Sequence, residues 1–286
     1  MTIHGGKFAR IDDISTARLW SVMEQAAQPK AVASNTALGT ARKRGVHSWS
    51  GSYQAYGATP AKMPGSVFNF EGYGSPVNDV SGAGLRYLGS AMVSQVVINW
   101  DWRTGAIIGH TVTFAGHLEL TKVSGADPGD ATDPDLPETT GTKIQWADSS
   151  LVTPVYADLP NVTNASLTIK AAVEAYVNSS TYVNGRAWTG QISGPVDWSV
   201  AIGQQDEERL TGVFDIDSII ELKLFTTSAL FWQLKYGIVR DFTGITANRE
   251  TGAIMGRTIN VDMNCFYDGE LGAVTRPDTT NWWPFA

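Results

Sequence analysis

The chain repeats a short motif after about 147 residues. Residues 104–109 read TGAIIG and residues 251–256 read TGAIMG, and the five residues that follow each motif share a pattern. A repeating unit of this size is too long for a solenoid turn and fits a small domain. We therefore expect two tandem copies of one domain. Other segments match in the same order: Thr16, Trp20 and Val22 with Thr163, Leu167 and Ile169; Trp49–Ser50 with Trp198–Ser199; Val67–Phe70 with Val213–Ile216; and Tyr87–Gly89 with Lys235–Gly237.

Both copies show the period of two that is typical of strands with one buried face. Gly105 and Gly252 predict hairpin turns in which the glycine takes a positive φ. The pattern predicts a mostly β fold of two tandem, homologous antiparallel β-sandwich or barrel domains, each with at most a short helix. The apolar face is expected to hold Trp49, Tyr53, Ile108, Val112, Phe114, Trp198, Ile202, Met255, Ile259 and Val261, and the opposite face Thr111, Thr113, Thr258 and Asn260.

The 286 residues suit two domains, each large enough to bury its own core. Between them lies a stretch with three prolines and several acidic residues, which predicts an exposed linker or long loop. We expect the first domain at 1–123, the linker at 124–143, the second domain at 144–280 and an aromatic C-terminal tail at 281–286. Because three aromatic residues would be unfavourably exposed in that tail, we expect it to dock on its own domain or on a neighbour.

Charge and cysteine content exclude several classes of protein. The first 147 residues hold 12 Lys and Arg against 12 Asp and Glu, whereas residues 148–286 hold 9 against 16, so the net charge of −7 lies in the second copy. This balance argues against affinity for DNA but not against DNA sliding past. The single cysteine, Cys265, allows no intrachain disulfide and no cysteine-based metal cluster. We recognise no segment of transmembrane length and no signal-peptide pattern.

The sequence offers no convincing catalytic, cofactor-binding or metal-binding residues. The four histidines are His4, His47, His110 and His117, and His110 is expected to be a polar residue at a strand end. An odd separation places His110 and His117 on opposite faces of a straight strand, so they do not form a chelating pair. Asp215 and Asp217, expected on one face of a strand, and the acidic cluster 206–208 are interpreted as surface charge rather than as glycosidase carboxylates. Trp49 and Trp198 fit core positions better than sugar-stacking positions.

Each copy resembles the tail tube proteins of long-tailed bacteriophages. In the first copy the resemblance rests on Gly6–Ile11 (GKFARI), on Trp20-Ser21-Val22, on Trp49–Gly57 (WSGSYQAYG), and on a hairpin that begins at Thr104-Gly105 and leads to Val112–Gly116 (VTFAG). The second copy lacks the first of these motifs. Some members of that family are duplicated and form trimers whose six domains imitate a hexameric ring.

The resemblance implies a structural virion protein without enzymatic activity or cofactors, assembled in the host cytoplasm. Its subunits would form stacked, trimeric and pseudo-hexameric rings, and DNA would pass through the lumen without specific binding. Partners would be further copies of the chain and other tail proteins: the tape measure, the tail tip or baseplate and the tail terminator. Thr111, Thr113, Thr258 and Asn260 are candidate wall positions, and net acidity would repel DNA phosphates.

Three alternatives stay open. A capsid-decorating or tail-tip structural protein would use related β domains. A carbohydrate-binding module is supported only by the aromatic and glycine content, and an enzyme comes last.

Overall fold

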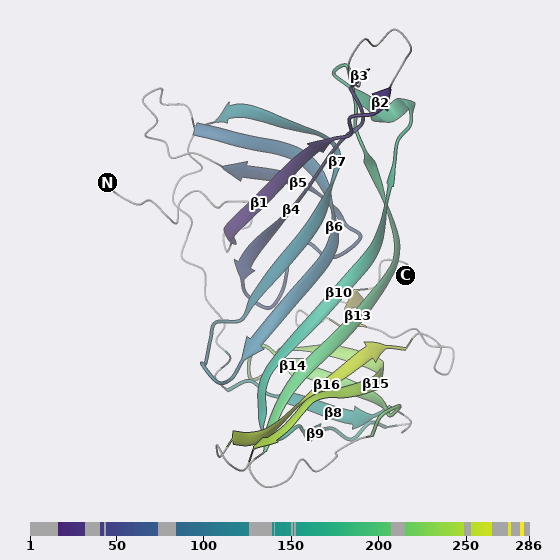
Figure 1. Cartoon of the computed structure of the whole chain (residues 1–286). Helices are drawn as coiled ribbons and strands as arrows, with labels where there is room; N and C mark the ends of the chain where they lie inside the picture. Colours follow the sequence, from purple (N-terminus) through teal and green to yellow (C-terminus); the bar gives the residue numbers. More distant parts are fainter. Residues whose placement is uncertain are drawn as a thin grey trace.

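The computed structural model consists almost entirely of antiparallel strands (Figure 1). It describes residues 17–31, 41–42, 44–73, 84–125, 139, 141–149, 151, 153–206, 215–248, 253–264, 274–275 and 281–282. The strands are β1 (Ala17–Ala26), β2 (Lys30–Ala31), β3 (Ala41–Arg42), β4 (His47–Tyr56), β5 (Val67–Tyr73), β6 (Gly84–Asp101), β7 (Gly109–Gly125), β8 (Ile144–Asp148), β9 (Ala157–Asp158), β10 (Val162–Tyr176), β11 (Tyr182–Val183), β12 (Arg186–Ala187), β13 (Gly190–Asp206), β14 (Ile219–Phe225), β15 (Phe231–Asn248), β16 (Ala253–Met263), β17 (Val274–Thr275) and β18 (Asn281–Trp282), with one short 3-10 turn, η1, at Ser179–Thr181.

One 14-stranded sheet runs through the whole molecule, in the order β1-β4-β7-β6-β10-β13-β16-β15-β14-β8-β9. Five strands of the first half pair in the order β1-β4-β7-β6-β5, and five strands of the second half pair in the order β10-β13-β16-β15-β14. The two sets meet where β6 pairs with β10. β6 has 18 residues, long enough for its first part to pair with β5 and its last part with β10.

The predicted alternation of buried and open faces is confirmed wherever the side chains are described. Trp49, Tyr53, Trp198 and Ile202 are buried, as are Ile108, Val112, Phe114, Ile259 and Val261. The intervening Thr111, Thr113, Thr258 and Asn260 are not buried. Gly105 has the predicted positive φ of 62°, whereas Gly252 and the Met255 side chain lie outside the described residues.

Strand pairing corrects the assignment of two repeated segments. β14 (Ile219–Phe225), not Val213–Ile216, takes the place in the second half that β5 takes in the first. Asp215 and Asp217 lie in the turn before β14, where Asp217 has a φ of 68°, so the expected strand at these acids is wrong. Val22, opposite Gly51, corresponds to Leu167, opposite Val200, which shifts the expected match by two residues and keeps each side chain on its face.

The two halves share one hydrophobic core. A single cluster of buried residues extends from Trp49 in β4 to Val261 in β16 and lies on the side of the sheet that β5 and β14 cover. Two indoles tie the halves together: Trp100 Nε1 donates to the Phe225 carbonyl at 3.0 Å, and Trp232 Nε1 donates to the Ala58 carbonyl at 2.9 Å. All four of these residues are buried.

The segments expected as linker and tail are described only in part. Ser124 and Gly125 end β7, and Thr139 is buried with its hydroxyl donating to the Asp101 and Ala106 carbonyls. At the tail, Asn281–Trp282 pairs with Val274–Thr275, which pairs with β15, so these two residues dock on their own chain as predicted. Gly6–Ile11, Cys265 and 283–286 lie outside the described residues. In the described part of the chain, no helix is long and apolar enough to cross a membrane.

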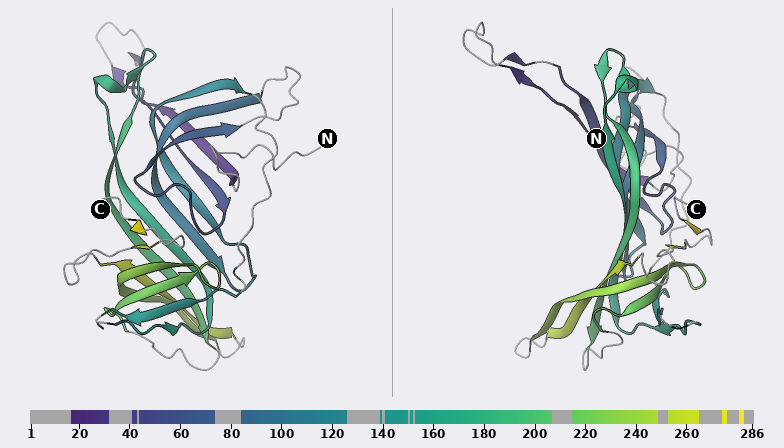
Figure 2. Two further views of the ribbon diagram at one scale, coloured as in Figure 1. Left: turned by 180° about the vertical axis from the view of Figure 1, so that it is seen from behind. Right: turned by 90° about the vertical axis from the view of Figure 1, so that its right-hand side faces the viewer.

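The sheet is strongly bent (Figure 2). In the right-hand view the face opposite the core is concave, and β2 and β3 extend away from the body of the molecule. A second hairpin, formed by the end of β10 and the start of β13, instead follows the body along its whole length.

Candidate assembly surface

The features that most distinguish this molecule are two free strand edges and its open face. β1 pairs only with β4 among the described residues. In the second half, β15 pairs with β14 up to Ile238, and beyond Val239 its outer edge has no neighbouring strand in the described part of the chain. A row of unpaired backbone N–H and C=O groups is a template for pairing with another chain.

The central junction between β6 and β10 is regular over seven residue pairs, from Asn164 opposite Asp101 to Lys170 opposite Gln95. The Trp102 N–H donates to the Thr163 carbonyl at 2.9 Å. Because hydrogen-bonded and non-hydrogen-bonded pairs alternate in an antiparallel ladder, Val96 and Ile169 form a hydrogen-bonded pair. The next pair, Val97 and Thr168, is non-hydrogen-bonded.

The second hairpin of the chain lies on the first half. Trp188 is fully buried, and its ring centroid lies 5.1 Å from that of His47. The Thr189 N–H donates to the His47 carbonyl at 3.0 Å, and the Thr189 carbonyl accepts from the Leu118 N–H at 2.8 Å. The Gln191 N–H contacts His117 Nδ1 at 3.0 Å. The hairpin thus joins the halves a second time, beside the pairing of β6 with β10.

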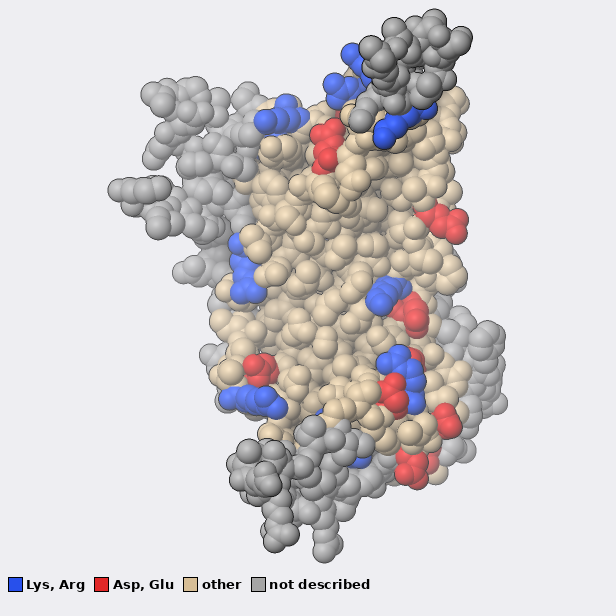
Figure 3. Space-filling model, in the orientation of Figure 1, with Lys and Arg blue, Asp and Glu red and all other residues tan. Residues whose placement is uncertain are grey.

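The open face is polar and carries few charged side chains. Figure 3 looks onto this face and shows few charged side chains over its centre. Arg240 donates to Asp241 and to Asp262, each at 2.8 Å. Rows of directly opposed residues cross the strands: Gln54, Thr111, Val97, Thr168, Ser199 and Asp262; Ser52, Thr113, Gln95, Lys170 and Asp197; and Asn99, Ser166, Ala201, Asn260 and Asp241.

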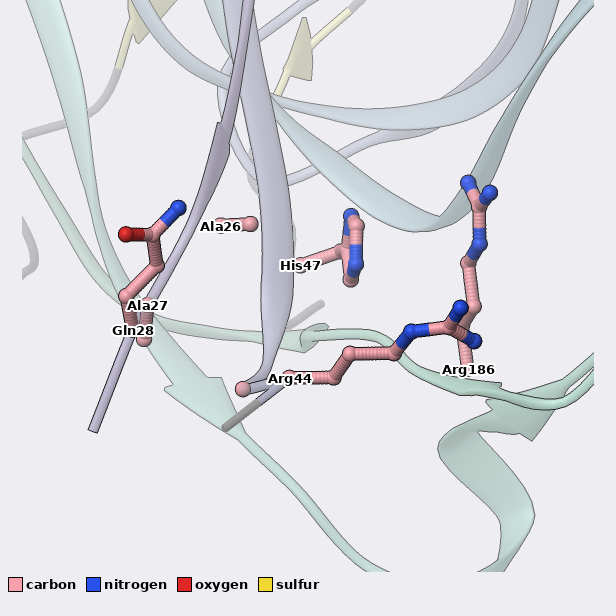
Figure 4. A pocket seen from close by; sticks show the side chains of 7 residues that line it. Ala26, Ala27, Gln28, Arg44, His47 and Arg186 are labelled. Atoms are coloured by element: carbon pink, nitrogen blue, oxygen red, sulfur yellow. The ribbon is translucent and has the colours of Figure 1, made fainter. Parts of the chain in front are cut away.

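A cationic pocket lies beside the base of the β2–β3 hairpin (Figure 4). It has a volume of about 420 Å³, and its polar side chains come from Gln28, Arg44, His47 and Arg186. His47 Nδ1 lies 3.5 Å from Glu24 Oε1. Within the described residues, neither Arg44 nor Arg186 forms an ion pair, so the lining of the pocket carries excess positive charge.

Two buried polar residues occupy matching places at the starts of β7 and β16. His110 Nδ1 lies 2.8 Å from the Gly57 carbonyl, and burial lowers the pKa of the His110 imidazole. Arg257 Nε donates to Gln204 Oε1 at 2.9 Å, and its guanidinium lies 4.8 Å from the centre of the Phe242 ring. Burial lowers the Arg257 pKa. His110 Nε2 and Arg257 Nη2 are buried without a hydrogen-bond partner among the described residues.

A third polar cluster lies in the second half, away from the central junction. The Tyr156 hydroxyl and the Gln233 amide both donate to Glu221, which is buried, and Gln233 also donates to Tyr156 at 3.1 Å. Lys223 Nζ lies 3.5 Å from the centre of the Tyr156 ring. Burial, with the Glu221 contact adding to it, raises the Tyr156 pKa. Each group is satisfied by its neighbours, which is the usual arrangement of a buried polar network.

The residues considered from the sequence as chemical groups are not brought together. His47 and His117 both contact the hairpin around Thr189, whereas His110 lies at the start of β7, and His4 is outside the described residues. Asp206 ends β13, and 207–208 are not described. Among the described residues no cluster of His, Cys, Asp or Glu could hold a metal ion. Trp49 and Trp198 are core residues, as predicted.

The free sheet edges could not be found from the sequence, because the repeat indicates which strands correspond but not which strands pair across the halves. Comparison with known protein families finds no matching family model. Comparison with curated proteins finds no matching sequence.

Proposed function

We propose that this chain is a structural subunit that assembles into stacked rings and forms the tail tube of a bacteriophage. Its two halves are two tandem, homologous domains of the tail-tube type, and three chains make one pseudo-hexameric ring. The observation that carries the proposal is the shared strand order of the two halves. They join edge to edge through β6 and β10, and the same kinds of edge are left free on β1 and on the last part of β15 within the described residues.

The motifs that resemble tail tube proteins support the proposal from their places in the fold. Trp20-Ser21-Val22 lies in edge strand β1, and Trp49–Tyr56 lies in its neighbour β4. The Thr104-Gly105 turn leads into β7, which pairs with β4. These motifs therefore occupy three neighbouring parts of one sheet.

The open face supports a role as the wall of a channel. Its rows of Ser, Thr, Asn and Gln present no line of cations to which phosphates would adhere, and affinity for DNA depends on such cations. Its carboxylates at Asp241 and Asp262 are bound by Arg240, so the face is close to neutral rather than basic. DNA would slide along such a wall without specific contacts. The tape measure, the tail tip or baseplate and the tail terminator would contact the ends of the stack.

Electron microscopy of the purified protein and of particles that contain it tests this proposal. Stacked rings of threefold symmetry with a central pore are expected. Isolated trimers on a capsid lattice would instead indicate a decoration protein. Localisation of the protein only at the distal end of a tail would indicate a tail-tip protein. A protein that stays monomeric at all concentrations would contradict the proposal.

A further inference from the structure

Val93 in β6 and Val239 in β15 occupy matching positions. Each forms two backbone hydrogen bonds with the segment just before β5 or β14. The Val93 carbonyl accepts from the Gly65 N–H (2.8 Å), and the Val93 N–H donates to the Ser66 carbonyl (3.0 Å). In the same way, the Val239 carbonyl accepts from the Asp217 N–H (2.8 Å), and the Val239 N–H donates to the Ser218 carbonyl (3.0 Å). The register then shifts by one residue in both strands, at Ser94 and at Arg240. After this shift β6 continues into the junction with β10, whereas β15 continues as a free edge.

The free edge of β15 therefore corresponds to the β6 edge of the central junction as far as Thr243, after which the register of β15 shifts again. Val96 and Val97 lie opposite Val112 and Thr111, and Phe242 and Thr243 lie opposite Ile259 and Thr258. Because Val96 directs its N–H and C=O groups toward β10, Phe242 directs the same groups outward.

β1 corresponds in the same way to β10. Met23 lies opposite Ser50 in β4, and Thr168 lies opposite Ser199 in β13. The Ala27 N–H donates to the Val46 carbonyl at 2.9 Å, which fixes the alternation along this ladder. Met23 and Gln25 therefore direct their backbone groups toward β4, and Glu24 directs its own away from β4.

We propose that the outer edge of β1 pairs antiparallel with the free edge of β15 in a second copy of the chain. Glu24 then forms the hydrogen-bonded pair with Phe242, and Met23 lies opposite Thr243 in a non-hydrogen-bonded pair. This register copies Ile169 opposite Val96 and Thr168 opposite Val97 in the central junction. The inference rests on the proposed ring assembly and specifies how its subunits join.

The positions of the two hairpins also support pairing of β1 with a second copy of the chain. The hairpin that contains Trp188 follows β10 and lies on the first half of its own chain. The hairpin of β2 and β3 follows β1, which corresponds to β10, yet it extends away from the body (Figure 2). A copy that pairs with β1 places its second half where this hairpin can lie. Contact between unlike edges is head-to-tail, and such contacts close into rings when the rotation permits.

The open face of β1 also carries exposed apolar side chains. Leu19 and Met23 are each 55% exposed. Long free edges with apolar side chains are aggregation sites unless they are paired. Pairing with a second copy satisfies the backbone groups and places side chains of a neighbouring strand beside Leu19 and Met23.

Cysteine cross-linking tests the register. Cys265 is replaced by Ser, and Met23→Cys and Thr243→Cys are introduced either in the same chain or in separate chains. Cα atoms of a non-hydrogen-bonded pair lie about 4.5 Å apart, within the roughly 4.4–6.8 Å that a disulfide requires. We expect mild oxidation to link most chains into covalent oligomers. Mixing the two single variants should give one dimer band, which proves that the link joins two chains. The matched control is Glu24→Cys with Thr243→Cys, which places the two thiols on opposite faces and should not link.

The outcomes separate the inference from the proposed function. Rings in the microscope without the 23–243 link, or with stronger linking in the control, overturn this register and leave the tube intact. A chain that remains monomeric by light scattering overturns both. The link could also be absent because residues 1–16 of the same chain cover β1, and deleting residues 2–15 tests this. If linking does not appear in the deletion variant, the inference is wrong. If linking appears only in the deletion variant, the edge of β1 is not an interface in the native protein.

Discussion

Replacing Trp232 with Phe tests whether the two halves form one cooperative unit. The Trp232 indole is fully buried and donates to the Ala58 carbonyl, which comes from the first half and is itself buried. Phe keeps most of the ring but removes the donor. The unpaired carbonyl costs about 1–3 kcal/mol, and the space left by the smaller ring adds about 1–2 kcal/mol. We therefore expect a loss of about 3 kcal/mol in the free energy of unfolding.

Thermal unfolding measures this loss under conditions where light scattering shows the monomer. At about 2.1 cal/mol/K per residue, the chain has an unfolding entropy of roughly 0.6 kcal/mol/K, so Tm should fall by about 5 °C. Trp198→Phe is the matched control, because Trp198 is equally buried and its Nε1 has no hydrogen-bond partner among the described residues. This control should lose only the part that comes from the smaller ring.

Hydrogen exchange of the Trp232→Phe variant shows which strands lose stability. If the halves unfold together, amides of β7 and of β16 should lose protection equally, because the exchange of both then reports global unfolding. Loss of protection confined to β14, β15 and β16 would refute the single cooperative core. A Tm equal to that of Trp198→Phe would refute the assigned energy of the hydrogen bond between the halves.

Three further predictions follow from local geometry. Gly116→Ala should destabilise the monomer by about 1–3 kcal/mol in urea unfolding, because the new Cβ would lie 2.3 Å from a buried indole, whereas Gly256→Ala, with its nearest atom at 3.7 Å, should change stability little. Burial lowers the His110 pKa, so the unfolded state binds more protons below about pH 6.5 and stability falls with falling pH; His110→Gln should lose less stability between pH 7 and pH 5, and equal losses would contradict this assignment. Glu24→Pro should weaken assembly about 5- to 150-fold per interface in sedimentation, for a cost of about 1–3 kcal/mol. The monomer should stay folded, because the Glu24 N–H faces away from β4. Met23→Pro should instead destabilise the monomer, and a destabilised Glu24→Pro monomer beside a stable Met23→Pro monomer would contradict the proposed edge.

The sequence predicts the faces of the strands well because the period of two is a local property. Thr111 and Val112 face opposite sides whatever β7 pairs with, and the positive φ of Gly105 follows from its turn alone. Matching Val22 with Ile169 or with Leu167 gives the same face, because the two alignments differ by an even number of residues. Only the strand pairs Val22–Gly51 and Leu167–Val200 decide between the two.

Long-range contacts could not be predicted. Nothing in the spacing of Trp232 and Ala58 indicates that they meet, since they are 174 residues apart. Val213–Ile216 has the composition of a strand, yet residues 215–218 form a turn whose backbone holds Val239. The free edges, the central junction and the docked hairpin all depend on such contacts, so the candidate assembly surface emerges only from the fold.

In the proposed ring, the joining of two halves in one chain changes the energetics of ring closure. Each chain already contains one junction, in which Lys170 lies opposite Gln95, and leaves one to be made between chains, in which the proposed register places Gln25 opposite Asp241. The junction within the chain forms at the high effective concentration of a tethered contact, so only half of the edge pairs depend on protein concentration. Because the two junctions no longer need identical residues, the edge between chains can change its charges without weakening the edge within the chain. Asp241 is bound by Arg240 and Asn260, which holds the carboxylate on the open face beside the free edge. In the proposed contact this carboxylate would lie beside the Gln25 amide, and a strand with an apolar residue at that position would leave it without that partner.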